Sequence, residues 1–212
     1  GLDILSNMVT PFQTTGGRTQ TRRTALALLA DYSFDSRYII SGSVRRDGSS
    51  RFGLDNQFGV FWSASAAWNI AKESFFNFSD MKALKLRGSY GIAGNDAPLP
   101  DYVNQPYVGF GLYGPSATTV IPTIIGNRNL EWEKVKITNV GLDFNYLNRF
   151  RGSVEYFINK RSDFLQQIPN ATVQGSYTVY DNAGELENKG LELDLSADVI
   201  RSKDWLFQLR GN

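Results

Sequence analysis

The sequence predicts an all-β protein, built as an antiparallel, up-and-down transmembrane β-barrel sheet. Three observations support this fold class. Apolar and polar residues alternate with a period of two, short and long connections alternate along the chain, and aromatic residues gather near the short connections. The composition of the 212 residues agrees, because 13% are aromatic, glycine occurs 20 times and runs of helix-favouring residues are scarce.

Eight segments show the alternation expected of strands with one apolar and one polar face. The clearest is 191–199, in which leucine, alanine and valine alternate with glutamate, aspartate and serine. Phe157 breaks the pattern in its strand, and an Ala-Leu run over 25–30 blurs the faces of the first strand. The expected strands are 19–34, 38–45, 60–70, 82–92, 139–146, 150–158, 191–199 and 205–209.

The connections between these strands differ in length in a regular way. Short ones are expected at about 32–37, 146–150 and 199–204, a longer Phe-rich one at 71–81, and long ones at 46–57, 94–130 and 160–189. Loops above about 15 residues are uncommon inside compact soluble domains. Outer-membrane barrels combine short periplasmic turns with long external loops, so this asymmetry favours a barrel over a soluble β-sandwich. Charged residues in the middle of strands are compatible with a barrel that has a water-filled lumen and with a solvent-facing sheet, so they do not distinguish the two folds.

The aromatic residues near the short connections support the same interpretation. Rings gathered at one level are typical of a membrane interface, although the core of a soluble sandwich is also aromatic. The members of this expected girdle are Tyr32, Phe34, Tyr38, Trp68, Phe75, Phe76, Tyr146, Phe150, Trp205 and Phe207.

Several functional classes are excluded by what the sequence lacks. With no cysteine and no histidine, it offers no disulfide, no Cys- or His-ligated zinc site and no Ser-His-Asp triad. A net charge of +1 argues against nucleic acid as a partner. No stretch of 18 apolar residues and no signal peptide is visible.

Patterns that suggest enzyme chemistry have simpler explanations. Residues 109–114 match the GxGxxG dinucleotide pattern, but no clear strand precedes them and Pro115 follows, so a glycine-rich external loop is expected. The acidic pairs at 131 and 133 and at 185 and 187 are as well explained by solvated strand faces and loops. We therefore expect no catalytic residue, no cofactor and no metal.

Three segments carry a resemblance when their order and spacing are considered together. They are RDGSSRFG at 46–53, LKLRGSYGIAGN at 84–95 and NLEWE at 129–133, with WNI at 68–70 and NKGLE at 188–192 as further matches. They resemble the barrel of the SusC/RagA group of TonB-dependent outer-membrane transporters of Bacteroidota. The resemblance covers about residues 20–212, nearly the whole chain.

The resemblance implies a place within a larger protein. Residues 1–212 are expected to be part of one β-barrel domain, supplying about eight strands of a 22-stranded barrel. The plug domain, the signal peptide and the carboxyl terminus of the barrel are expected to lie outside this sequence.

The resemblance also implies a function. The protein is expected to cross the bacterial outer membrane several times. Its expected function is TonB-dependent import of oligosaccharides or peptides. The implied partners are a SusD-like surface lipoprotein, TonB through a segment absent here, and outer-membrane lipid. A passive outer-membrane porin or surface adhesin barrel is the first alternative, and a soluble β-barrel binding protein is the second. A plug domain upstream would distinguish the active transporter from the pore.

The motifs suggest local structure as well. Asp47-Gly48 is expected to begin a turn held tightly at the barrel rim, with Arg51 paired to Asp47 or Asp55; a cation or sugar contact is the functional alternative. The glycines at 91 and 94, with Asn95, are expected where a strand leaves for a long loop and needs positive φ.

Candidate contacts for cargo or lipoprotein lie in the long loops. Their rings can stack on sugars, or pack against the lipoprotein or one another; they are Tyr102, Tyr107, Phe110, Tyr113, Tyr177 and Tyr180. Trp132 is expected in the aromatic girdle, with a glycan-stacking platform as its alternative.

The alternation also predicts which way each side chain faces. Val140, Leu142, Phe144, Val154, Tyr156, Leu193 and Leu195 are expected to face lipid, and Asp143, Glu155, Glu192 and Asp194 the lumen.

Overall fold

A computed structural model of the chain describes residues 18–113, 117–172 and 175–212. Within these ranges it contains twelve strands and one short 3-10 helix. They are β1 (Arg23–Phe34), β2 (Tyr38–Ser49), β3 (Phe58–Asn69), η2 (Ile70–Lys72), β4 (Met81–Asn95), β5 (Tyr107–Tyr113), β6 (Ala117–Ile124), β7 (Glu133–Tyr146), β8 (Phe150–Ser162), β9 (Leu165–Thr172), β10 (Gly175–Asn182), β11 (Glu185–Arg201) and β12 (Leu206–Gly211).

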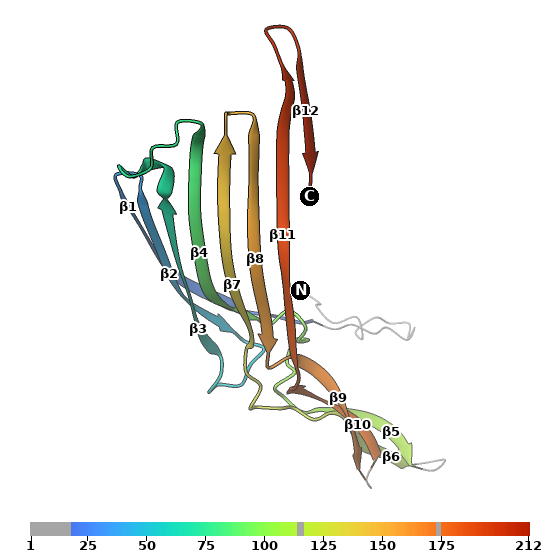
Figure 1. Ribbon diagram of the computed structural model, residues 1–212. Coiled ribbons are helices and arrows are strands. Elements are labelled where there is room, and N and C mark those ends of the chain that lie inside the picture. Colours follow the sequence, from blue (N-terminus) through green and yellow to red (C-terminus); the bar gives the residue numbers. More distant parts are fainter. Residues whose placement is uncertain (1–17, 114–116, 173–174) are drawn as a thin grey trace, which may run out of the picture.

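Eight strands form one large antiparallel sheet, in the order β1-β2-β3-β4-β7-β8-β11-β12. They are the eight strands that the alternation predicts, so the predicted fold class is confirmed. In Figure 1 the sheet is open and curved, with the short connections at its upper end and the long connections at its lower end. We call these the short-turn end and the rim end.

Four further strands correct the prediction for the long connections. Residues 94–130 and 160–189, expected as loops, contain the hairpins β5-β6 and β9-β10, which form a second sheet in the order β5-β6-β10-β9. This small sheet projects from the rim end in Figure 1. Two prolines argue against strands in these segments when the sequence is considered alone. Pro169 lies in the edge strand β9, and Pro122 lies at a register shift in β6. Both are positions where a sheet tolerates proline.

The register of the large sheet places the predicted apolar and polar residues on opposite faces. Val140 pairs with Tyr156, and Tyr156 pairs with Leu191, so the three share one face. Glu155 pairs with Gly141 and with Glu192 on the other face. The alternation predicted from sequence is therefore continuous from strand to strand, and we call the two sides the apolar face and the polar face.

Phe157, the exception to the alternation, lies on the polar face. Its ring covers Gly190, where an added Cβ would meet the Phe157 Cζ at 2.9 Å. The glycine leaves room for the ring against the backbone of β11, so one aromatic side chain fits among polar neighbours.

The short-turn end carries the expected aromatic residues, and most of them are exposed. Phe75 is 64% exposed and Trp205 is 76% exposed. Polar contacts around Glu73 stabilise this end. Its carboxylate accepts hydrogen bonds from the Tyr38 hydroxyl at 2.6 Å and the Trp68 indole at 2.8 Å, and it pairs with Arg37 at 3.5 Å.

The described residues include no helix with the length and apolar character needed to span a membrane.

The buried hydrophobic residues gather at the rim end. We call them the rim cluster, and its members are Phe52, Phe61, Leu99, Val103, Leu130, Trp132 and Leu165. They come from the connection 50–57, from β3, from both sides of the β5-β6 hairpin and from the start of β9. The long connections therefore fold back and pack on one another.

Candidate functional site

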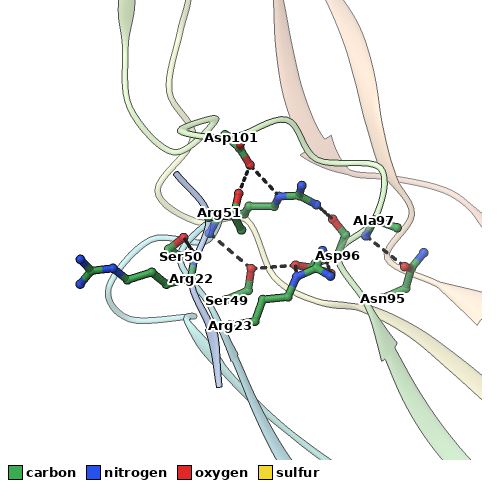
Figure 2. A network of polar contacts seen from close by, with 10 residues as sticks. Arg22, Arg23, Ser49, Ser50, Arg51, Asn95, Asp96, Ala97 and Asp101 are labelled. Atoms are coloured by element: carbon green, nitrogen blue, oxygen red, sulfur yellow. Dashed lines mark hydrogen bonds and ion pairs between the residues drawn. The ribbon is translucent and has the colours of Figure 1, made fainter. Parts of the chain in front are cut away.

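The rim brings the first resemblance motif into direct contact with the segment that follows the second one, residues 96–101. The Ser49 hydroxyl donates to the Asp96 carboxylate at 2.7 Å. The Arg51 guanidinium donates to Asp101 at 3.2 Å and to the main-chain carbonyl of Asp96 at 3.1 Å. Figure 2 shows these side chains converging from the end of β2 and from the segment after β4. The segment 46–53 is thus held tightly at the rim, as the sequence predicts.

The amino-terminal side of β1 joins the same network. Arg23 pairs with Asp96 at 3.0 Å, and the hydroxyl of Thr21 donates to Asp101. The hydrogen bond from Thr21, followed by the contact with Arg51, holds the pKa of the Asp101 carboxyl below its usual range. Asp101 is therefore ionised over the whole neutral range and fixes the position of Arg51.

Two details of the predicted turn are wrong. Asp47 and Gly48 lie inside β2, and the chain turns only after Ser49. Arg51 pairs with neither Asp47 nor Asp55, because Asp47 pairs with Arg45 at 2.5 Å and the Arg51 side chain reaches Asp101 instead. Arg51 pairs with a residue far away in the sequence because β2 continues as a strand through Asp47, which places that carboxylate out of its reach.

Trp132 is the centre of the rim cluster, so its predicted place in the girdle is wrong. It is 8% exposed, and its ring lies 4.8 Å from the Phe52 ring and 5.5 Å from the Phe61 ring, measured between centroids. The third motif therefore packs directly on the first, through two aromatic contacts that single residues in the sequence do not reveal.

The glycines near Phe61 serve close packing rather than positive φ. A Cβ on Gly94 or on Gly59 would overlap the Phe61 ring. Among the described residues Gly184 is the one glycine with positive φ, so the expectation of positive φ at residues 91 and 94 is wrong. Gly94 is required because the ring of Phe61 occupies the space above it.

The segment 126–133 closes the rim against the segment 53–56. Asn56 donates to the main-chain carbonyl of Asn129 at 3.2 Å, and a Cβ on Gly53 would overlap the carbonyl of Arg128. Glu133 follows at the start of β7 and is only 2% exposed, with Arg161 at 3.9 Å from its carboxylate. The expectation that the carboxylate at 133 is solvated is therefore wrong.

The predicted contact residues separate into two groups. Trp132 lies in the rim cluster, Tyr180 is half-buried against it, and the hydroxyl of Tyr102 accepts a hydrogen bond from the backbone of Gln20 at 2.9 Å. The other four lie on the strands of the small sheet, as Tyr180 does; they are Tyr107, Phe110, Tyr113 and Tyr177. The pattern at 109–114 thus lies on β5 rather than in a loop, except for Gly114, which is outside the described residues.

A hollow that the sequence did not indicate lies beside this network. Its volume is about 330 Å³, and it is lined by Gly53, Leu54, Asp55, Asn104, Gln105, Pro106 and Arg128. The amide of Asn104 donates to the carbonyl of Phe52 at 2.7 Å, while its own oxygen has no hydrogen-bond partner. The hollow is therefore lined by both polar and apolar groups, and it lies between the segment 53–55, the segment 104–106 and Arg128.

The polar face carries paired charges in the middle of the strands. Arg87 contacts Asp143 at 3.2 Å and Glu155 at 2.5 Å, and Arg210 contacts Asp194 at 2.8 Å. The guanidinium of Arg87 lies over Gly141, where a Cβ would come within 2.8 Å of its Cζ. Such a face suits contact with water or with a polar partner. No group of acidic side chains that could hold a metal ion occurs in the described part of the chain.

Comparison with known proteins gives consistent matches. Residues 3–212 match the family model described as TonB dependent receptor-like, beta-barrel. The chain is 36% identical over 205 residues to the TonB-dependent receptor SusC of Bacteroides thetaiotaomicron, covering 91% of this chain and 20% of that protein. It is 32% identical over 183 residues to the TonB-dependent receptor P39 of Formosa agariphila, covering 85% and 18%.

A solved structure agrees in three dimensions. The RagAB peptide transporter superposes with a TM-score of 0.78 at 29% identity, covering 90% of this chain and 22% of that chain. The chain thus spans about a fifth of the length of the relatives that it matches.

Proposed function

This chain belongs to the TonB-dependent receptor-like β-barrel family, with relatives of the SusC/RagA type, and we propose that it forms part of the wall of an energised outer-membrane importer. Members of this family are outer-membrane β-barrel proteins, and the relatives named above are receptors and a transporter rather than enzymes. The proposed protein performs no bond chemistry; it presents a polar interior through which cargo passes.

The observation that carries the proposal is the two-faced sheet. Large apolar side chains such as Leu191, Leu193 and Tyr156 stand exposed on one face, while Arg87 and its acidic partners stand on the other. A soluble protein would expose this apolar face to water, which costs about 25 cal/mol for each Å². Lipid outside and an aqueous lumen inside satisfy both faces.

Cysteine labelling tests the facing. A lipid-soluble maleimide should modify a cysteine at Leu193, and a membrane-impermeant maleimide should modify one at Glu192. Reaction of the Leu193 position with the aqueous reagent alone would reverse the assignment.

We propose that the rim end faces the cell exterior, because long connections in outer-membrane barrels are external. Leu54 at the rim is 86% exposed and Phe78 at the short-turn end is 74% exposed, so each is a convenient site for a single cysteine. On intact cells the impermeant reagent, and added protease acting on 94–130 and 160–189, should reach the rim end. Labelling confined to the Phe78 position would mean that the barrel is inverted.

We also propose that β1 and β12 pair with further strands of a larger barrel. Both are edges of the large sheet, and unpaired backbone groups inside a membrane cost several kcal/mol each. Residues 1–212 alone should therefore aggregate or need detergent. A monodisperse, cooperatively melting monomer without detergent would contradict this and favour the soluble β-barrel alternative.

Cargo and partner are proposed from the relatives and from the rim. The RagAB relative is a peptide transporter, and we propose a peptide or oligosaccharide cargo delivered with a SusD-like lipoprotein, with energy from TonB. The proposed contacts are Tyr107, Phe110, Tyr113, Tyr177 and Tyr180 on the small sheet, with Tyr102 and Trp132 as further candidates at the rim.

Uptake measurements distinguish the transporter from a passive pore. Cells that carry the complete protein should accumulate labelled peptide or oligosaccharide, and loss of TonB or of the proton gradient should abolish this accumulation. Entry that continues without TonB would favour a porin. Genes for a SusD-like lipoprotein, and for peptidases or glycoside hydrolases beside it, would identify the cargo class.

A further inference from the structure

The apolar face ends, toward the rim, in a fringe of basic residues. We call these the basic fringe, and they are Arg46, Lys134, Lys136, Lys160 and Lys189. Three of them are ion-paired: Lys134 with Glu131 and Asp163, Lys160 with Glu185, and Lys189 with Glu187. Arg46 and Lys136 form no ion pair with a described carboxylate. The rows between the basic fringe and the short-turn end pair apolar residues, as in Leu142 with Val154 and Val154 with Leu193.

Two lysines of the basic fringe lie directly opposite each other. Lys136 on β7 and Lys160 on β8 are register partners and share the apolar face. Like charges in this arrangement are destabilising unless an anion lies between them. Lys160 is held by Glu185, whereas no carboxylate of the described residues forms an ion pair with Lys136. Lys136 therefore presents a positive charge that no described carboxylate neutralises.

The position of the pair along the strand indicates which anion it meets. The Lys136–Lys160 row lies ten residues from the aromatic row formed by Tyr146 and Phe150. That is about 34 Å along a strand, or about 26 Å along the membrane normal at a tilt of about 40°. This separation matches the apolar band of an outer-membrane barrel, about 25 Å tall. The aromatic row and the lysine row therefore lie at the two borders of the hydrocarbon.

Arg46 extends the basic fringe across the sheet. Its guanidinium lies 4.3 Å from the centre of the Phe58 ring, and Phe58 is exposed on the same face. An arginine stacked on an exposed ring presents its remaining donors to whatever borders the apolar band. Because it forms no ion pair with a described carboxylate, it adds uncompensated positive charge to that border.

We infer that the basic fringe binds phosphate groups of lipids in the membrane leaflet next to the rim, with one phosphate seated at Lys136 beside Lys160. The inference rests on the proposed membrane location, since it requires the apolar face to meet lipid. Phosphate is the anion that a lipid presents at the edge of the hydrocarbon, and lysine and arginine near an anionic surface contribute about 1 kcal/mol each.

The test uses the complete barrel protein in detergent and a matched pair of lipids. Phosphatidic acid and the diacylglycerol with the same chains differ by the phosphate alone, and native mass spectrometry counts the molecules that stay bound. Phosphatidic acid should be retained in preference to diacylglycerol. Lys136→Gln should weaken that retention by about fivefold, and Lys136→Arg should keep it. Arg46→Gln should weaken retention to a smaller degree.

Lys85→Gln is the matched control, because it removes the same charge from the polar face, away from lipid in the proposed arrangement, and should change nothing. Equal retention of the two lipids, or wild-type retention by Lys136→Gln, would overturn the inference while leaving the barrel in its membrane. Complete displacement by millimolar inorganic phosphate would show a free-anion site and overturn the lipid assignment. A complete protein that stays soluble without detergent would instead contradict the proposed function.

Discussion

The two ends of the large sheet achieve order in different ways. At the rim end Phe52 and Leu130 are fully buried among residues of this chain. At the short-turn end Phe75 and Phe78 are 64% and 74% exposed. The rim therefore makes its own core from long connections, whereas the short-turn end has turns too short to do so and depends on its surroundings. In a barrel, lipid surrounds the short-turn end. The rim end therefore resembles the core of a soluble domain, whereas the short-turn end resembles an interface.

The largest expected effect is at the rim cluster. Phe52→Ala in the complete barrel should reduce the free energy of unfolding by about 3–5 kcal/mol, because it empties a site with no access to solvent. Urea unfolding from vesicles measures the change. Phe75→Ala is the comparison at the short-turn end and should cost less, because lipid can fill the space that its ring leaves. Equal costs at the two positions would mean that the two ends are stabilised alike.

The next effect sharpens the comparison between the two faces. Leu193→Arg places a charge near the middle of the apolar band and should cost about 2–4 kcal/mol in vesicles. Glu192→Arg, one residue earlier and on the polar face, serves as its control. Unfolding in lipid vesicles measures both. A larger cost for the control would mean that the polar face, and not the apolar face, meets lipid.

The polar network of the rim should give a smaller effect. Ser49→Ala removes the donor that reaches the buried Asp96 carboxylate, which then keeps Arg23 as its partner. A loss of about 1–3 kcal/mol is expected. Ser43→Ala, which breaks an exposed contact with Ser63 on the polar face, is the comparison and should cost less. If both serines prove silent, the network does not stabilise the rim.

Acid should weaken the two ends together, and this is the smallest effect. Hydrogen bonds, first from Tyr38 and then from Trp68, hold the pKa of Glu73 below its usual range, and Thr21 and Arg51 do so for Asp101. A carboxyl whose pKa is lower in the folded state stabilises the fold above its unfolded pKa, about 4, and loses that contribution as the pH falls through the folded value. Stability should therefore be constant from pH 7 to about 5 and fall below about pH 4.

Single neutral variants separate the two contributions. Glu73→Gln and Asp101→Asn should each flatten part of the decline below about pH 4 in an acid titration followed by thermal melting. A decline that is identical in both variants and in the wild type would assign acid sensitivity to other groups.

The large sheet was predictable from sequence because its information is local. Each strand alternates apolar and polar residues by itself, so the row from Val140 to Leu191 follows without knowledge of the neighbours. The short turns and the exposed aromatic residues beside them follow for the same reason. Even the count of eight strands in that sheet depends on local patterns alone.

The rim was predictable as a place but not in its contacts. Arg51 meets Asp101, fifty residues away, and Trp132 meets Phe52, eighty residues away. Nothing local to Trp132 distinguishes a ring that packs on other rings from one that meets lipid. The small sheet was missed because Pro122 and Pro169 argue locally against strands, while edge position and a register shift make both acceptable.

The contacts of the rim cluster also bear on the order in which the chain folds. Hairpins such as β1-β2 and β7-β8 close across three residues each, at little cost in loop entropy. Phe52, Val103, Leu130 and Leu165 can meet only after the intervening strands have paired. Contacts between such distant residues form slowly and late. We therefore expect the contacts of the rim cluster to form last during folding. A barrel wall in which these contacts have not yet formed would be the natural substrate for assembly factors and proteases.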